Sequence, residues 1–335
     1  MKRLLALMAV AAGLGLAPPA QAADYELKIS TMFPSTHFIQ KIALEPWAKE
    51  IEEKTDGRVH FTFFPAGSAF GDATRQFDQV RTGVVDVAVG IPAIPRGRHP
   101  RTVLIELPFT VPDAEVGTCA LMAVKDDVKA DFPGTHILSL TVTEPSAVHT
   151  KTRVETLEDL KGMRIRTPTP AITAMLEYIG ATPVGMPPTE IYESVERGVV
   201  DGNVMPWGPV GAFKLWEVLK YHLDAGINPV SMYTLMNQNR YDSLPEDIRE
   251  IIDEVSAERF DKNWGKWWAE TDQEAIDAAK ENGNEITPMS AETRDEWREK
   301  LKGVIDTYLA ENSGLDKAEA EALYATMREA VAQCE

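Results

Sequence analysis

Strand-like and helix-like hydrophobic patterns follow one another along the chain from residue 25 onwards. Residues 25–31 (YELKIST) and 59–65 (VHFTFFP) alternate between apolar and polar side chains, as half-buried β-strands do. Between them, Leu44, Trp47 and Ile51 have helical spacing. Residues 71–83 and 84–92 repeat the order of helix and strand, and residues 137–144 (ILSLTVTE) add a further strand. This alternation predicts an α/β fold built on a sheet.

A second α/β unit is predicted to begin near residue 145. After the short strand MRIRTP (163–168), the pattern gives a helix at 171–180, a strand at 181–186, a helix at 189–198 and a strand within 199–207. The sequence Gly-Val-Val-Asp follows a helix in each half, at 83–86 and at 198–201. Residues 23–335 are about two domains by length.

A long amphipathic helix is predicted downstream of a strand at 232–237. Leu244-Pro245-Glu246-Asp247 is typical of a helix start, with proline at an early position and acids in the first turn. An apolar face then continues to about Asn282, a reach of about 57 Å, unless the helix breaks near Gly265. A helix of this length would brace two lobes. Its tryptophans (Trp264, Trp267 and Trp268) are predicted to form a packing face rather than a ligand cage.

The first 22 residues have the pattern of a cleavable secretory signal. Lys2 and Arg3 precede an apolar run at 4–16, which ends before Ala20-Gln21-Ala22. The run is too short to span about 30 Å of hydrocarbon, and no other stretch is as apolar. We therefore expect export to the periplasm of a protein that does not span the membrane.

Charge and cysteine content narrow the function classes. The chain has 34 basic and 52 acidic residues, a net charge of −18, which makes nucleic acid an improbable partner. An anion site in such a chain requires a locally desolvated cation rather than a basic surface. The spacing of the six histidines and two cysteines predicts no metal site. Cys119 and Cys334 can pair in the periplasm, but we expect them to be unpaired, because Cys119 has a buried helical pattern and Cys334 lies in a tail that can fray.

The strand MRIRTP carries two arginines on one face. Arg164 and Arg166 are two residues apart, and the strand must end at Pro168. A guanidinium at a strand end presents a rigid fork of donors that matches a carboxylate. The pattern alone favours the alternative, in which both arginines are solvated or pair with Glu158 or Asp159.

The chain resembles the solute-binding subunits of tripartite ATP-independent periplasmic (TRAP) transporters, the DctP family. The matching residues are Leu160-Lys161-Gly162, Arg164-Ile165-Arg166, Gly180-Ala181-Thr182-Pro183, Glu190-Ile191-Tyr192 and Gly198-Val199-Val200-Asp201-Gly202. The resemblance places Arg166 at the family's ligand-carboxylate arginine. It also implies a type II-like, two-lobed periplasmic-binding-protein fold with crossing hinge strands and a long helix spanning both lobes.

That fold predicts two discontinuous lobes. Lobe I comprises residues 23–143 and 230–265, and lobe II comprises residues 144–229 and 266–335 with the C-terminal helices. The resemblance further implies an organic-acid ligand, delivery to TRAP membrane permease subunits driven by an ion gradient, and no cofactor. We expect a monomer.

Ligands of open α/β sheets bind outside the carboxyl ends of the strands, and this rule selects the other candidate site residues. They are Phe33, His37, Phe70, Ile91, Pro92, Glu144, Ser146, Met205, Pro206 and Trp207. Trp207 is alternatively a core residue under its loop, and His37 a cap of the helix that follows it. Met205 stands where many family members have asparagine, so a polyhydroxylated sugar acid would leave hydroxyls unpaired. We therefore predict a small monocarboxylate with an apolar or aromatic body.

Three function classes remain to be weighed. There is no acid between Asp201 and Glu217, which disfavours the cation-bridged binding of some family members. An enzyme is disfavoured because the sequence has no nucleophile elbow, phosphate-cradling loop or dinucleotide fingerprint. A subunit that senses the ligand for a membrane receptor would share every pocket feature with a transport protein. The prediction is a periplasmic solute-binding subunit of a TRAP transporter, with the sensing protein as the alternative.

Overall fold

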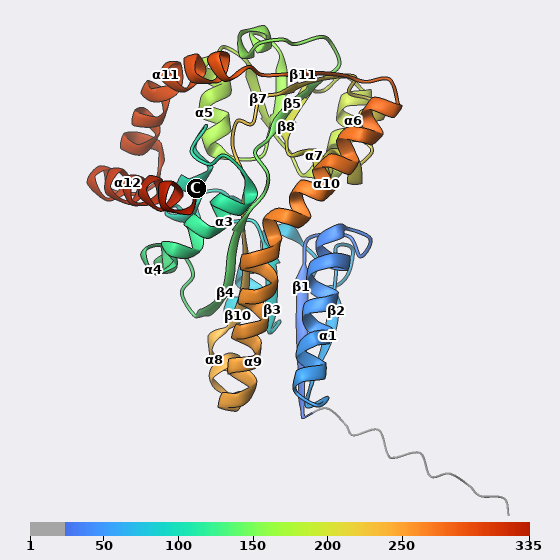
Figure 1. Ribbon diagram of the computed structural model, residues 1–335, viewed down its shortest axis with the longest axis vertical. Coiled ribbons are helices and arrows are strands. Elements are labelled where there is room, and N and C mark those ends of the chain that lie inside the picture. Colours follow the sequence, from blue (N-terminus) through green and yellow to red (C-terminus); the bar gives the residue numbers. More distant parts are fainter. Residues whose placement is uncertain (1–23) are drawn as a thin grey trace, which may run out of the picture.

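The protein is built on two separate mixed sheets, stacked along the long axis of the molecule (Figure 1). The structure is a computed structural model that describes residues 24–335, so the predicted signal sequence lies outside the described residues. Each sheet with its covering helices forms one lobe. This architecture confirms the predicted α/β, two-lobed fold.

The first sheet has the strand order β2-β1-β3-β10-β4. Strand β1 pairs in parallel with β2 and β3, whereas β10 runs antiparallel to β3 and β4. The alternating residues of β1 place Leu27 and Ile29 in the core. The bounds are β1 Tyr25–Thr31, β2 Val59–Phe64, β3 Val87–Gly90, β4 Thr135–Val142 and β10 Ser231–Asn237.

The second sheet has the order β11-β9-β5-β8-β6-β7. Strands β7, β6 and β8 are parallel, β5 is antiparallel to β8 and β9, and β11 is parallel to β9. The bounds are β5 Ala147–Thr150, β6 Arg164–Thr167, β7 Thr182–Gly185, β8 Gly202–Met205, β9 Tyr221–Asp224 and β11 Glu285–Pro288. The carboxyl ends of β6 and β8 therefore lie at the same edge.

Two chain segments cross between the lobes side by side. Residues 143–146 lead from β4 to β5, and residues 225–230 lead from β9 to β10. They are joined by backbone hydrogen bonds, from Thr143 N to Val230 O (3.0 Å) and from Ser146 N to Asn228 O (2.7 Å). These segments are the crossing connections that the family resemblance implies, although they are not themselves β-strands. The division of the lobes into residue ranges stays a prediction.

Helices cover both sheets (Figure 1). Helix α1 packs against β2, α3 against β4, and α5 against β6 and β7. Their bounds, with those of the remaining helices, are α1 Glu45–Lys54, α2 Gln76–Arg81, α3 Ala114–Ala123, α4 Lys125–Val128, α5 Pro170–Tyr178, α6 Ile191–Glu196, α7 Trp207–Ala212, α8 Gln238–Asp242, α9 Glu246–Ser256, α10 Lys262–Glu281, α11 Ala291–Thr307 and α12 Lys317–Cys334.

The predicted long helix is present and reaches from one lobe to the other. Helix α9, a π-helical turn at Ala257–Asp261 and α10 follow without interruption from Glu246 to Glu281. The helix contacts α1 and β4 near its start, and α7 of the second lobe further along (Figure 1). It does not break at Gly265, where α10 packs against α3.

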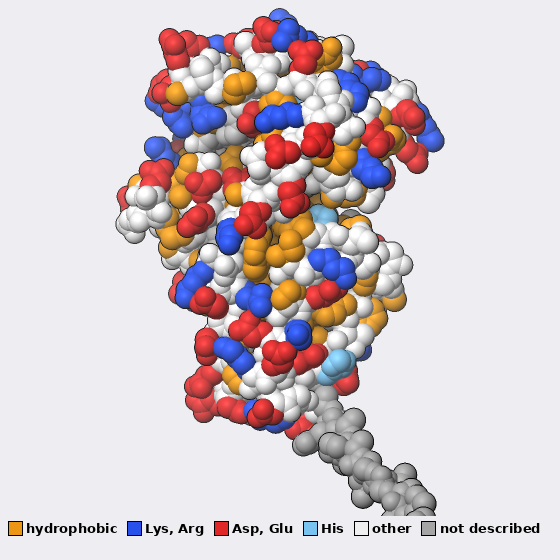
Figure 2. Space-filling view, turned by 45° about the vertical axis from the view of Figure 1, so that its right-hand side comes forward, with side chains coloured by type: hydrophobic (Ala, Val, Ile, Leu, Met, Phe, Trp, Pro, Cys, Tyr) orange, Lys and Arg blue, Asp and Glu red, His pale blue; other side chains and the backbone are white. Residues whose placement is uncertain are grey.

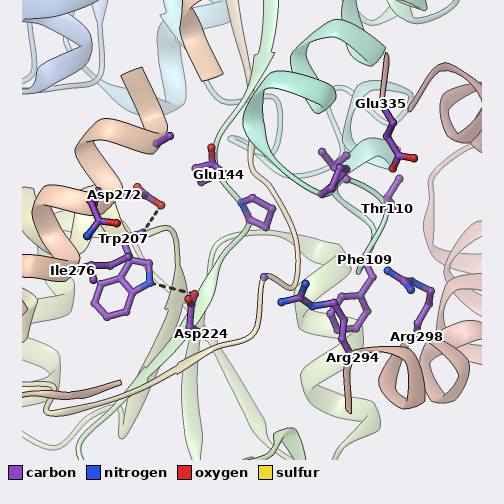
Figure 3. A pocket seen from close by; sticks show the side chains of 16 residues that line it. Phe109, Thr110, Glu144, Trp207, Asp224, Asp272, Ile276, Arg294, Arg298 and Glu335 are labelled. Carbon is purple, nitrogen blue, oxygen red and sulfur yellow. Dashed lines mark hydrogen bonds between the residues drawn. The ribbon is translucent and has the colours of Figure 1, made fainter. Parts of the chain in front are cut away.

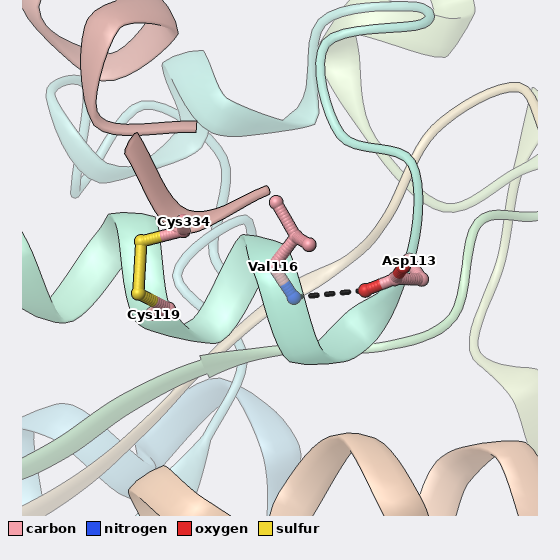
Figure 4. The surroundings of a disulfide bond; sticks show 4 residues. All are labelled: Asp113, Val116, Cys119 and Cys334. Atoms are coloured by element: carbon pink, nitrogen blue, oxygen red, sulfur yellow. Dashed lines mark hydrogen bonds between the residues drawn. A yellow bond between two sulfur atoms is a disulfide. The ribbon is translucent and has the colours of Figure 1, made fainter. Parts of the chain in front are cut away.

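The expectation that the two cysteines are unpaired is wrong. Cys119 on α3 and Cys334 on α12 form a disulfide, with their Cα atoms 6.0 Å apart (Figure 4). The C-terminal helix is held because it buries an apolar face that includes Leu323, Met327 and Val331. Sequence spacing alone does not reveal that this face packs against α3, which brings the two cysteines together.

The surface in Figure 2 carries acidic and basic side chains interspersed over both lobes, and hydrophobic side chains gather at the waist between them. Within residues 24–335, no helix is both long and apolar enough to cross a membrane.

Candidate functional site

Arg166 is a buried cation without a carboxylate partner. It lies on β6, and 4% of its surface is exposed. Its Nε donates to the carbonyl of Met186 (3.2 Å) and its Nη1 to Oδ1 of Asn203 (3.5 Å). Among the described residues, no acidic group forms a salt bridge with it. Burial lowers the pKa of Arg166 to about 10, so the guanidinium stays charged at neutral pH.

Arg164 lies on the same strand in a different environment. Its Nη2 donates to Oδ1 of Asp201 (2.7 Å) and its Nε to Oδ2 of the same carboxylate (3.1 Å). The side chain of Arg164 is about half exposed. Its charge is therefore matched by the protein itself, whereas that of Arg166 is not.

Arg166 faces a cavity of about 270 Å³ between the lobes, which we call the Arg166 cavity. Both sheets supply its walls at the carboxyl ends of their strands, as expected for an open α/β fold. Six predicted site residues meet there, namely Phe33, His37, Ile91, Arg166, Met205 and Pro206. Apart from Arg166, His37 and two threonines, the walls are apolar side chains, glycine and proline.

His37 is a neutral donor in this cavity. Its Nδ1 accepts a hydrogen bond from the backbone N–H of Ile39 (3.2 Å), so the hydrogen of the neutral ring is on Nε2. Burial lowers the pKa of His37 to about 4. The ring stacks on Phe33, with centroids 4.5 Å apart. His37 thus accepts from the first residue of the helical segment Ile39–Leu44, although Phe38 holds the N-cap position, and it also lines the cavity.

The other predicted site residues do not line the Arg166 cavity. The Phe70 ring packs edge-on against Phe64, and the Pro92 carbonyl accepts from His99. Ser146 is buried at the crossing segments. Glu144 and Trp207 line a second cavity, and the Trp207 ring is 2% exposed within the core of the second lobe.

Several cavity residues are not among the predicted site residues. They are Met32, Thr143, Pro168, Pro187, Pro188, Pro209, Phe213, Val230, Met232 and Trp268, with Asn203 behind Arg166. Pro168 and Pro187 follow strands β6 and β7, so the strand-end rule was sufficient to find them. Trp268 could not be found in this way, because it comes from the long helix.

The second cavity, which we call the hinge cavity, has a volume of about 410 Å³ and adjoins the crossing segments. Figure 3 shows Glu144, Asp224 and Asp272 on one side of it, and Arg294 and Arg298 beside Phe109 on the other. Burial raises the pKa of Glu144 to about 7 and that of Asp272 to about 8. Asp272 accepts from the backbone N–H groups of Trp207 (3.3 Å) and Gly208 (2.6 Å), and Arg298 pairs with Asp295. Asp272 is held by α7 and Arg298 is paired with Asp295, whereas Arg294 forms no salt bridge among the described residues. The Arg166 cavity is smaller but is the better candidate site, because the strand ends of both sheets surround its single buried cation.

The described residues hold no group of three or more His, Cys, Asp or Glu side chains suited to a metal ion. The Arg166 cavity is suited to bind an anion whose uncharged part is apolar. A two-lobed α/β fold with such a cavity between its lobes defines a solute-binding protein.

The chain belongs to the DctP family, bacterial extracellular solute-binding protein family 7, which it matches over residues 29–312. It is a TRAP solute-binding protein and not an enzyme. A benzoate-bound TRAP solute-binding protein from Rhodoferax ferrireducens T118 is 30% identical, with a TM-score of 0.85 over 92% of this chain and 98% of that one.

Two further relatives extend this comparison. A marine metagenome TRAP solute-binding protein specific for aromatic acids, solved with metahydroxyphenylacetate, is 28% identical, with a TM-score of 0.86 over 93% of this chain and 99% of that one. The 2,3-diketo-L-gulonate-binding periplasmic protein YiaO of Escherichia coli K12 is 28% identical over 74% of this chain and 76% of its own.

Proposed function

We propose that this protein captures a small organic monocarboxylate with an aromatic or otherwise apolar body and delivers it to TRAP membrane permease subunits. The observation that carries the proposal is Arg166, a buried guanidinium without a carboxylate partner among the described residues, on a cavity with mostly apolar walls. A ligand carboxylate would supply the missing countercharge by a bidentate contact. Relatives that bind benzoate and metahydroxyphenylacetate support the same ligand class.

Capture would proceed by closure of the two lobes over the solute. The walls of the cavity come from both sheets, so closure buries the ligand between them. The candidate contacts are Arg166 for the carboxylate, with Phe33, His37, Ile91, Met205 and Pro206 around the body. The predicted signal at residues 1–22 would export the protein to the periplasm, where it would act as a monomer.

A ligand panel tests the proposal. We expect benzoate, phenylacetate and mandelate to raise the thermal midpoint and to bind in calorimetry, because a ligand at about 100 times its Kd stabilises the native state by about 2.7 kcal/mol. Galacturonate and glucuronate should bind more weakly, since each hydroxyl left unpaired costs about 1–3 kcal/mol. A sugar acid that binds more tightly than every aromatic acid would overturn the proposal.

A further inference from the structure

Trp268 lines the Arg166 cavity, and its indole N–H has no acceptor among the described residues. The residue is 2% exposed. Two other buried tryptophans of the same lobe are satisfied: Trp47 Nε1 donates to Ser256 Oγ (3.0 Å) and Trp264 Nε1 to the Val142 carbonyl (3.0 Å). Because buried donors are nearly always paired, an orphaned N–H beside a cavity indicates an acceptor that arrives with the ligand.

Of the other polar side chains on the cavity wall besides Arg166, His37 is a donor, Thr143 is already engaged, and the Thr189 hydroxyl can donate or accept. The Nε2–H of His37 has no acceptor among the described residues, while its Nδ1 is occupied by Ile39. The hydroxyl of Thr143 donates to the Glu144 carbonyl (2.8 Å) and accepts from Val230 N (2.9 Å). The cavity therefore offers hydrogens to the body of the ligand, in addition to those of Arg166.

We propose that the solute carries a second oxygen acceptor on its apolar body, a hydroxyl or carbonyl that is recognised by Trp268 and His37. This inference rests on the proposed capture of an aromatic monocarboxylate. It specifies further which aromatic monocarboxylates the protein selects. An unsubstituted ring leaves both donors unpaired, and a methyl group of similar size does the same. A ring oxygen at the matching position satisfies them, so the site selects by hydrogen bonding rather than by size.

The test compares isosteric ligands by calorimetry. Wild-type protein is titrated with benzoate, the three hydroxybenzoates and the three methylbenzoates. We expect at least one hydroxybenzoate to bind about tenfold or more tightly than the methylbenzoate of the same substitution pattern. Trp268→Phe removes the N–H and keeps an aromatic ring, so it should reduce this ratio about tenfold while changing benzoate binding less. Trp267→Phe, on the same helix but outside the cavity, should leave the ratio unchanged.

A second measurement does not depend on the variant folding. In proton NMR spectra of the wild-type protein, the Trp268 indole proton should move downfield with the preferred hydroxybenzoate and not with its methyl isostere. Equal binding of hydroxyl and methyl isosteres, an unshifted indole proton, or equal weakening of both ligands by Trp268→Phe would overturn the inference and leave the proposed function intact. Failure of every aromatic acid to bind wild-type protein would instead overturn the proposed function itself.

Discussion

Arg164 and Arg166 show how burial, rather than residue type, decides the role of a side chain. Both project from β6, two residues apart. The outer one is solvated and forms a two-point pair with Asp201, and the inner one is desolvated and keeps donors free at the cavity. An exposed pair of this kind contributes little to stability, whereas a buried cation gains much from a matching anion.

Substitution of each arginine separates these roles. Arg166→Ala should weaken binding of the best carboxylate by about 2–5 kcal/mol, because the ligand carboxylate would be buried without its partner. Arg166→Lys keeps the charge but loses the planar fork, so binding should be weakened by a smaller amount. Arg164→Ala is the control and should change binding by less than about 1 kcal/mol. Calorimetric titration of all three variants with one ligand tests these expectations. Loss of binding in Arg164→Ala alone would refute the assignment of the carboxylate contact to Arg166.

The sequence does not reveal toward which of the two cavities each of two consecutive loop residues points, and this limits the prediction of individual contacts. Thr143 lines the Arg166 cavity and Glu144 the hinge cavity; Pro206 and Trp207 divide in the same way. The rule that ligands bind at strand ends identifies the correct turns. Beyond the end of a strand, however, side chains no longer alternate between the two faces of the sheet, so the sequence does not tell which cavity a residue lines. Asn203 is different: its side chain contacts Arg166 from within β8, and a lone buried asparagine has no distinguishing pattern.

At the scale of elements, the long helix depends on close contact with α3. Gly265 lies where the two helices meet, and a Cβ there would come within 2.6 Å of the backbone and Cβ of Glu115. The glycine that suggested a break in the sequence therefore allows close packing instead.

Two glycine substitutions test this contact. Gly265→Ala should destabilise the protein by about 1–3 kcal/mol, because the helices must move apart. Gly303→Ala in α11 is the matched control, since its Cβ would meet no atom within 4 Å. It should be neutral or stabilising by up to about 1 kcal/mol, through helix propensity alone. The urea unfolding midpoints of both variants are compared with that of the wild type. An equal shift in the same direction would show that the close contact with α3 does not determine the effect of Gly265→Ala.

Strands β5 and β9 illustrate elements that the pattern does not reveal. Each is four residues long and contains a buried histidine, so neither appears as an apolar run. The two rings are paired by their Nδ1 atoms (2.7 Å), and His222 reaches Asn284 through Nε2 (2.8 Å). These partners lie far apart in the sequence and exist only after the sheet has formed. The repeated helix and strand order, by contrast, was sufficient to predict most of both sheets.

At the scale of the whole molecule, the crossing segments separate two cavities of different chemistry. The Arg166 cavity has one cation and mostly apolar walls, whereas the hinge cavity has charges of both signs, with Arg294 and Arg298 opposite Asp272 of the long helix (Figure 3). Asp272 joins this helix to the second lobe by accepting from the first backbone N–H groups of α7. Its neighbours Glu144 and Asp224 add repulsion to the cost of burying its charge.

This arrangement predicts that stability falls as pH rises. The pKa of Asp272 is raised from 3.8 to about 8, so between these values the folded state holds a proton that the unfolded state has lost. The contribution to stability is fully present below pH 4 and is lost as pH approaches 8. Asp272→Asn cannot ionise, so its stability relative to wild type should improve by roughly 2–5 kcal/mol between pH 4 and pH 8.

The comparison is made as a difference between variant and wild type at each pH, because other buried acids such as Glu106 titrate in the same range. Asp277→Asn, at an exposed position on the same helix, controls for loss of a helical charge. Denaturant unfolding at pH 4, 6 and 8 measures all three proteins. A constant difference between Asp272→Asn and wild type would mean that Asp272 is ionised throughout. In that case, its hydrogen bonds to α7 would outweigh its burial and the two neighbouring acids.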